Sequence, residues 1–187
     1  MKRLIFAALL FAWLPAVAQN ANAPNSDRRA ALDRLLGSLK SAPSEEIAGP
    51  LERQIKELWL NAGTPAVTLL MSRGLREMKA DAKQDAIEDF SAAITLDPSL
   101  AEAYHQRAIA RFAAGDTPGA IADLQATLQH EPRSFVAFQT LSAIAEARKD
   151  WKGAYDAWQK VLEIDPKTPG GQERLKDLRR RALGEET

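Results

Sequence analysis

Apolar residues recur through most of the chain at the three- and four-residue spacing that is typical of amphipathic helices. Tyr104, Ala108 and Phe112, for example, fall on one face of a helix. Gly115 and Asp116 follow, and this pair is typical of a helix end and of the cap of the next helix. The local pattern therefore predicts pairs of helices joined by short turns.

The helix pairs recur with a fixed period. Pro98, Pro132 and Pro166 are spaced by 34 residues. Each proline is preceded by an alanine at twelve residues and by bulky residues at eight and 28; these are Ala86, Ala120 and Ala154, then Phe90, Leu124 and Trp158, then Leu70, Tyr104 and Phe138. Because proline cannot continue a helix interior, each one closes a unit. Such repetition predicts helix pairs that stack around a continuous core.

These residues resemble the tetratricopeptide repeat family, whose 34-residue unit is a helix–turn–helix with an aromatic, alanine and proline pattern. The resemblance covers three units, at 67–100, 101–134 and 135–168. It implies an all-α fold, a right-handed α-solenoid of tandem antiparallel helix pairs. The sequence departs from the family pattern at Leu70, where an early aromatic is usual, and at Glu77 and Arg111, where tyrosine is usual.

Helices are also expected on both sides of the repeats. Residues 19–66 carry two apolar stripes, Leu32, Leu35, Leu36 and Leu39, then Ile47, Leu51, Ile55 and Leu58, and the second helix either bends at Pro50 or begins there. The sequence leaves open whether this pair is a degenerate repeat. Residues 169–187 carry a C-terminal capping helix and tail, with Leu175, Leu178 and Ala182 on the apolar side. A polar outer face suits an element that closes a solenoid.

Two helix starts carry capping signals. Thr64 followed by Pro65 is typical of an N-cap residue and the first position of a helix. Ser99 with Glu102 three residues later predicts a capping box, in which each side chain bonds the backbone of the other residue.

Residues 1–18 have the pattern of a secretory signal peptide. Lys2 and Arg3 precede an apolar stretch at 4–17, which is shorter than the ~20 residues of a membrane-spanning helix. Ala16-Val17-Ala18 then supplies the small residues of a cleavage site. We expect cleavage after Ala18, with an uncleaved anchor as the alternative, and no stable membrane span after cleavage. The protein is therefore expected to be exported, with the periplasm as its compartment.

Composition argues against several classes of function. Lys and Arg together number 25, as do Asp and Glu, so the chain lacks the basic excess of a nucleic-acid-binding protein. It has no cysteine, and its two histidines, His105 and His130, have no partner at helical spacing that would complete a metal site. We expect both histidines to be exposed to solvent. No nucleophile motif is present, so we expect no enzyme, no metal and no cofactor.

The resemblance implies a concave groove lined by the first helix of each unit. The candidate peptide-binding residues are Thr68, Met71, Met78, Glu102, His105, Gln106, Phe112, Gln139, Thr140 and Glu146. The alternative is that apolar residues at these positions pack against neighbouring helices. Some family members bind a partner's terminal carboxylate through Lys, Asn and Arg in this groove, but the corresponding positions here hold Met71, Leu75, Gln106, Val136 and Thr140. We therefore expect no carboxylate recognition of that kind.

The sequence favours a non-catalytic protein–protein interaction module of the cell envelope. Its groove would hold a peptide or a helical segment of a partner protein, in assembly or maturation of envelope proteins. Two alternatives stay open, a solenoid that associates with itself as a structural element and an enzyme with an unrecognised site. The sequence names neither the partner nor the oligomeric state. Trp158 is expected in the core, whereas Trp59 could be a core residue or an interface anchor.

Overall fold

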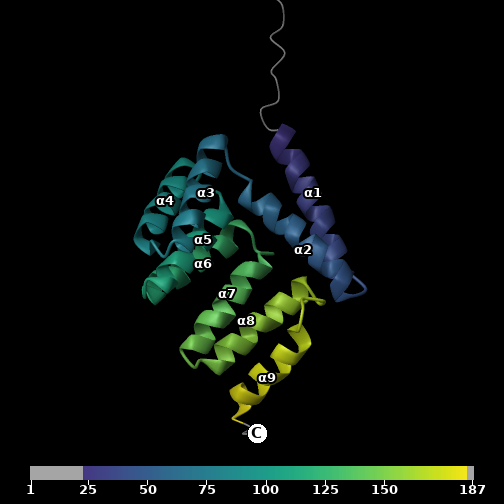
Figure 1. Cartoon of the computed structure of the whole chain (residues 1–187). Helices are drawn as coiled ribbons and strands as arrows, with labels where there is room; N and C mark the ends of the chain where they lie inside the picture. The colour runs from purple at the N-terminus through teal and green to yellow at the C-terminus, as the bar shows by residue number, and fades with distance from the viewer. Residues whose placement is uncertain (1–22, 185–187) are drawn as a thin grey trace, which may run out of the picture.

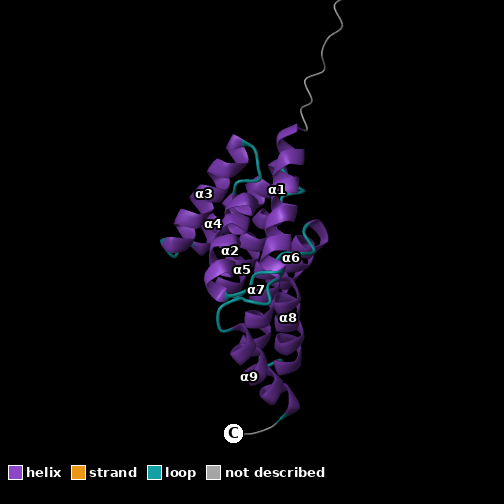
Figure 2. Ribbon diagram, turned by 90° about the vertical axis from the view of Figure 1, so that its right-hand side faces the viewer, coloured by secondary structure: helices purple, strands orange, loops and turns teal. Residues whose placement is uncertain are grey.

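The computed structural model describes residues 23–184, and all of its regular structure is α-helical (Figures 1 and 2). The helices are α1 (Ala23–Lys40), α2 (Glu45–Leu60), α3 (Pro65–Lys79), α4 (Lys83–Leu96), α5 (Ala101–Ala113), α6 (Thr117–His130), α7 (Phe135–Ala147), α8 (Trp151–Ile164) and α9 (Gly171–Leu183). The predicted all-α solenoid is confirmed. The predicted signal peptide and its cleavage site lie outside the described residues.

Six of these helices form three successive pairs. α3 packs on α4, α5 on α6 and α7 on α8, and α9 then packs on α8 at the C-terminal end (Figure 1). The periodic positions build the core: the three alanines at 86, 120 and 154 are fully buried, as are Phe90 and Leu124, and Trp158 is buried beside them. Each predicted unit therefore contributes one large side chain and one small one to the space between its helices.

A small residue is required where the two helices of each pair approach most closely. A Cβ atom at Gly74 would lie 2.7 Å from the ring of Phe90, which is too close for any real contact. Ala108 and Ser142 occupy the equivalent positions in the next two units, and both are buried. The helix pairs can therefore pack tightly only because these positions carry no bulky side chain.

Each of the first two repeats has an arginine–aspartate ion pair in which the carboxylate is buried. Arg107 donates two hydrogen bonds to Asp123, at 2.9 and 2.7 Å, and Arg73 makes the same forked contact with Asp89, 34 residues earlier. The third repeat has no equivalent pair, and there Ser142 Oγ donates to the carbonyl oxygen of Ala154 at 3.0 Å.

The capping predictions have different outcomes. Asp116 accepts a hydrogen bond from the Gly119 N–H at 2.9 Å, and Thr64 accepts from Val67 at 3.4 Å, as predicted. The predicted capping box at Ser99 is wrong. Leu100 is the N-cap residue of α5 and makes no side-chain cap bond, while Ser99 donates to Asp97. Glu102 is instead buried, and its carboxylate accepts a hydrogen bond from the side chain of Gln106 on the same helix.

The N-terminal hairpin, α1 and α2, does not stack on α3 as one repeat stacks on the next. It lies against the later repeats, with α2 in contact with α5 and α1 in contact with α8 (Figure 1). The buried side of α2 consists of Ala48, Glu52, Ile55 and Trp59, so the predicted apolar stripe is turned by about one residue, and Ile47 is 52% exposed. The helix begins at Glu45, not at Pro50.

None of the helices described between residues 23 and 184 combines the length and the apolar character that crossing a bilayer requires.

Candidate functional site

Four of the predicted groove residues meet in one polar network between α5 and α7. His105 Nε2 lies 3.1 Å from Thr140 Oγ1, and His105 Nδ1 lies 3.3 Å from Glu102 Oε1. Gln106 Nε2 donates to the same Glu102 oxygen at 2.6 Å. His105 is 5% exposed, so the expectation that it faces solvent is wrong: its Nε2 contacts Thr140 of the next repeat, and its Nδ1 contacts Glu102 of its own helix. His130 is exposed as expected, and its ring stacks on Tyr104.

The other predicted groove residues are distributed between the groove and the core. Met71 is 1% exposed and lies in the core of the first repeat, against which Met78 also packs, while Phe112 packs on the core of the second. Thr68 is half-buried on the first turn of α3. Spacing along a helix places these residues near the groove but does not tell which of them a neighbouring helix covers.

Gln139 and Glu146 connect α7 to the C-terminal part of the chain. Gln139 Nε2 lies at the 3.5 Å limit of a hydrogen bond to Thr168 Oγ1, and Glu146 forms an ion pair with Arg174 of α9. Arg174 also lies over the ring of Trp158, 4.4 Å from its centroid. The last helix is therefore fixed to the third repeat through the groove side of α7.

A part of the groove remains accessible. Gln106, Ile109 and Gln139 are all half-buried, and Ala143 is exposed. Ile109 belongs to none of the packed apolar clusters found among the described residues. This combination of amides and a free aliphatic side chain suits a ligand that offers both backbone groups and an apolar side chain.

The edge of the groove is covered by the chain's own α2. Trp59 packs on Phe135, with ring centroids 5.4 Å apart and planes inclined at 48°, and Lys56 Nζ lies 5.3 Å from the centre of the Phe135 ring. Phe135 and Val136 are the first two residues of α7, one turn before Gln139 and Thr140. The apolar stripe of α2 was visible in the sequence, but nothing local indicated which surface it would cover.

Two carboxyl groups meet beneath α2. Glu52 of α2 and Asp165, which follows α8, are 7% and 0% exposed. Lys56 Nζ lies 2.9 Å from Glu52 Oε2, and the Lys167 N–H donates to Asp165 Oδ1 at 3.3 Å, while Glu52 Oε1 and Asp165 Oδ2 have no donor. Burial, with the Glu52 carboxyl beside it, raises the pKa of Asp165 to about 7. A proton held between the two groups would give the remaining oxygens a partner.

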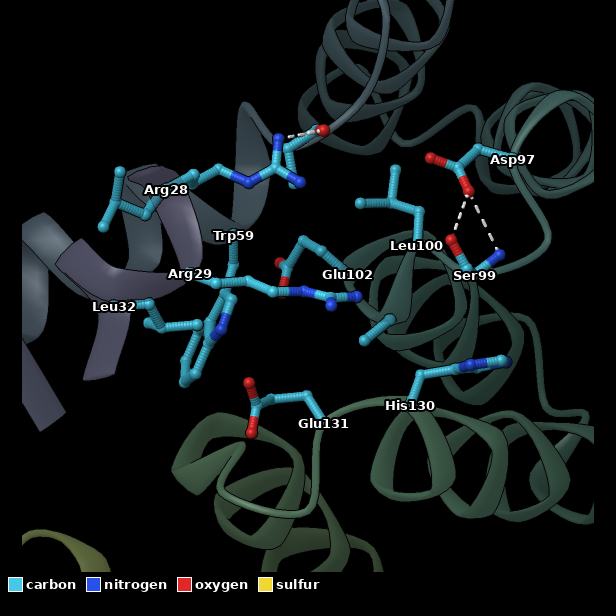
Figure 3. Close-up of a pocket in the computed structure, with 13 residues that line it drawn as sticks. Arg28, Arg29, Leu32, Trp59, Asp97, Ser99, Leu100, Glu102, His130 and Glu131 are labelled. Carbon is cyan, nitrogen blue, oxygen red and sulfur yellow. Dashed lines mark hydrogen bonds between the residues drawn. The ribbon is translucent and has the colours of Figure 1, made fainter. Parts of the chain in front are cut away.

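A cavity of about 220 Å³ separates the hairpin from two of the loops that join successive repeats (Figure 3). Arg28 donates a hydrogen bond to the Ala62 carbonyl at one edge, and Arg29 extends into the opening toward Glu102, with Glu131 on the opposite wall. Trp59 also lines the cavity, and its indole N–H is buried without a partner. An unpartnered buried donor costs about 1–3 kcal/mol, so the hairpin does not fit the repeats perfectly here.

The described residues contain no group of three or more side chains that could hold a metal ion.

Comparison with known proteins identifies the repeat. No protein-family model matches this sequence. A TPR repeat-containing protein of Rhizobium etli is 26% identical to it over 171 residues, which are 91% of this chain and 83% of the relative. The chain has the fold of the tetratricopeptide repeat family and is similar in sequence to one of its members. The match extends over nearly the whole chain, so it includes the hairpin as well as the repeats.

Solved structures of tetratricopeptide repeat (TPR) domains have the same fold. The Sgt2 TPR domain of Aspergillus fumigatus superimposes with a TM-score of 0.59 at 24% identity, covering 64% of this chain and 81% of that domain. The TPR2B domain of yeast Sti1, solved as a complex with an Hsp70 peptide, gives a TM-score of 0.58 at 18% identity, covering 66% of this chain and all of that domain. At these identities the likeness concerns the fold.

Proposed function

We propose that this TPR protein is a protein-interaction module whose concave groove holds a peptide or helical segment of a partner protein. The observation that carries the proposal is the accessible stretch of groove formed by Gln106, Ile109 and Gln139, where two amides flank an aliphatic side chain that packs in no core cluster. Amide side chains can bond the backbone of an extended segment, and Ile109 can receive an apolar side chain.

Structural neighbours support this use of the groove. The Sti1 domain was solved with an Hsp70 peptide, and the first TPR domain of Spaghetti (RPAP3) with the Hsp90 peptide SRMEEVD. This chain has Met71, Leu75 and Val136 at positions where carboxylate-binding members carry polar residues. Its ligand is therefore an internal segment, with an apolar side chain against the accessible Ile109, and not an acidic C-terminus.

We further propose that the module works in the cell envelope. This rests on the signal-like pattern of residues 1–18, since a chain exported through such a signal would meet its partners there. The proposed task is to hold a segment of an envelope protein during its assembly or maturation, without catalysis.

A photo-activatable cross-linker at the groove would test the proposal. Placed at position 109, it should capture a partner from envelope extract, and the same group at Gln125, which is exposed on α6, should not. Gln106→Ala with Gln139→Ala should reduce the capture at position 109 by roughly tenfold, corresponding to about 1.4 kcal/mol. The matched control is Gln125→Ala with Gln159→Ala, both on exposed positions of the second helices. Equal capture at positions 109 and 125 would contradict the groove assignment.

A further inference from the structure

We propose that the surface beneath α2 is a binding site for an amphipathic helix of a partner protein, and that α2 is its resident, displaceable occupant. The partner helix carries the chemistry of α2 itself, a carboxyl, an aliphatic and an aromatic side chain at the spacing of Glu52, Ile55 and Trp59. This inference rests on the proposed function and deepens it, because it names the kind of partner and what controls its access to the groove edge.

The covered surface belongs to the repeats and is apolar. Phe135 and Val136 of α7 are buried under the hairpin, and Ile164 at the end of α8 packs against the same cluster. These residues continue directly into the accessible groove, since Gln139 lies one turn after Phe135 on α7. If the hairpin moved away, the groove would gain an apolar extension suited to one face of a helix.

The contact that holds α2 in place is imperfect. Among residues 23–184, Trp59 Nε1 is a buried donor at this contact that has no hydrogen-bond partner. Glu52 Oε1 and Asp165 Oδ2 also have no donor unless a proton lies between them. The indole N–H, and the two oxygens once that proton is lost, would bond water when α2 left the surface, so they favour the open state. A partner helix that satisfied these atoms would compete with α2 although α2 is tethered to the site.

Charges around the carboxyl pair also weaken the contact. Lys56 of α2 is the cation that pairs with Glu52, and Lys167 lies beside Asp165 in the loop after α8. Three further carboxylates line the adjoining groove, Glu45 and Glu46 at the start of α2 and Glu173 on α9. On the α1 side, Arg133 pairs with Asp33, next to Lys40 and Glu163. Loss of the proton from Asp165 would place another negative charge in a predominantly acidic contact.

The hairpin can leave the repeats as one body. Its two helices pack on each other, and the Arg28 hydrogen bond to Ala62 ties its ends together. Along the chain only the short turn at 61–64 connects it to α3. Leu60 and Ala62 pack on the core of the first repeat at this junction, but α2 makes no extended contact with α3. Rotation about this turn would therefore uncover the site without unfolding a repeat.

A disulfide that locks the hairpin tests the inference. The chain has no native cysteine, so Glu52→Cys with Asp165→Cys can form one defined bond where the two side chains already meet. The probe is a fluorescently labelled synthetic peptide of residues 45–60, and its binding to the full chain is followed by anisotropy with and without reductant. We expect at least tenfold weaker binding to the oxidised protein, and no effect of reductant on the Glu52→Cys single variant.

A second peptide makes the test specific. Replacing the residues that correspond to Ile55 and Trp59 by Asp and Ala should abolish binding to the reduced protein. Equal binding to the oxidised and reduced proteins, or no binding of the native peptide to either, overturns the inference. The proposed function is judged separately. If the cross-link at position 109 still captures the partner in the oxidised protein, the groove assignment stands, but the inference that α2 controls access to the groove is wrong. Circular dichroism and thiol counting verify that the double-cysteine variant is folded and oxidised.

Discussion

Trp59 and Phe135 pack ring against ring at the junction between the N-terminal hairpin and the third repeat, with centroids 5.4 Å apart. Phe135 is fully buried although it is the first residue of its helix. Its burial is provided by α2, since Trp59 covers it and Lys56 lies over its ring. The hairpin is thus part of the hydrophobic core and also the cover of the groove edge.

Removing the Trp59 ring should destabilise this junction. Trp59→Ala should lower the free energy of unfolding by about 3 kcal/mol, the lower end for a buried Trp, because the lost packing is partly offset by removal of an unpartnered N–H. Trp59→Phe should cost less than half as much, since it keeps a ring against Phe135. Denaturant titration measures both. If the two variants are equally destabilised, the ring contact does not hold the junction.

Asp165 should make stability depend on pH. Its pKa is raised from an ordinary value of 3.8 to about 7, so the folded protein holds a proton that the unfolded chain releases above about pH 4. The stability from this group is fully present below that pH and is lost as the pH rises through 7. The Tm should therefore fall between pH 5.5 and 8 in the parent, and Asp165→Asn should flatten that fall.

The control for this titration is Asp156→Asn, at an exposed position of α8 where the carboxylate pairs with Lys152. It should leave the pH dependence as it is in the parent. Parallel pH profiles for the parent and Asp165→Asn would show that the carboxyl pair is not the source.

Glycines in the hairpin and the first repeat should respond oppositely to the same change. At Gly74 an added methyl group would lie 2.7 Å from Phe90, so Gly74→Ala should force the pair α3–α4 apart and cost about 1–3 kcal/mol. At Gly37, inside α1, nothing lies within 4 Å, so Gly37→Ala should stabilise by about 0.5–1 kcal/mol through helix propensity. Thermal unfolding compares them, and loss of stability at both positions would contradict the packing argument.

Asp123 is expected to be essential for the second repeat. It is buried and accepts hydrogen bonds from Arg107 and from Arg111, the latter at 2.8 Å. Asp123→Ala would leave two guanidinium groups without their anion and should cost about 3 kcal/mol in urea titration. Arg107→Met with Asp123→Leu should restore part of that loss, because an apolar pair of similar size needs no counter-ion. If the changes in the free energy of unfolding caused by the two substitutions simply add in the double variant, the two residues are not coupled.

Much of the repeat architecture could be predicted because its signals are local or strictly periodic. The proline period located the units, the alanines at 86, 120 and 154 marked the close contacts, and Asp116 and Thr64 act as caps where their neighbours indicated. The Arg107–Asp123 pair also repeats with the 34-residue period and could have been found from it. The groove residues were only partly predictable, since Met71 and His105 lie on the expected helices but are covered by neighbours.

The sequence by itself determined the all-α class, the helix pairs, their period and the residues that fill each pair, because these depend on spacing within one unit. Only the tertiary structure decided where the hairpin docks, which carboxyl faces Asp165 and how much of the groove stays accessible. Arg133 pairs with Asp33, 100 residues away in the chain, and the buried side of α2 packs on helices of the third repeat. Helical spacing shows which residues share a face, but the partner of that face is chosen by the packing of the whole chain.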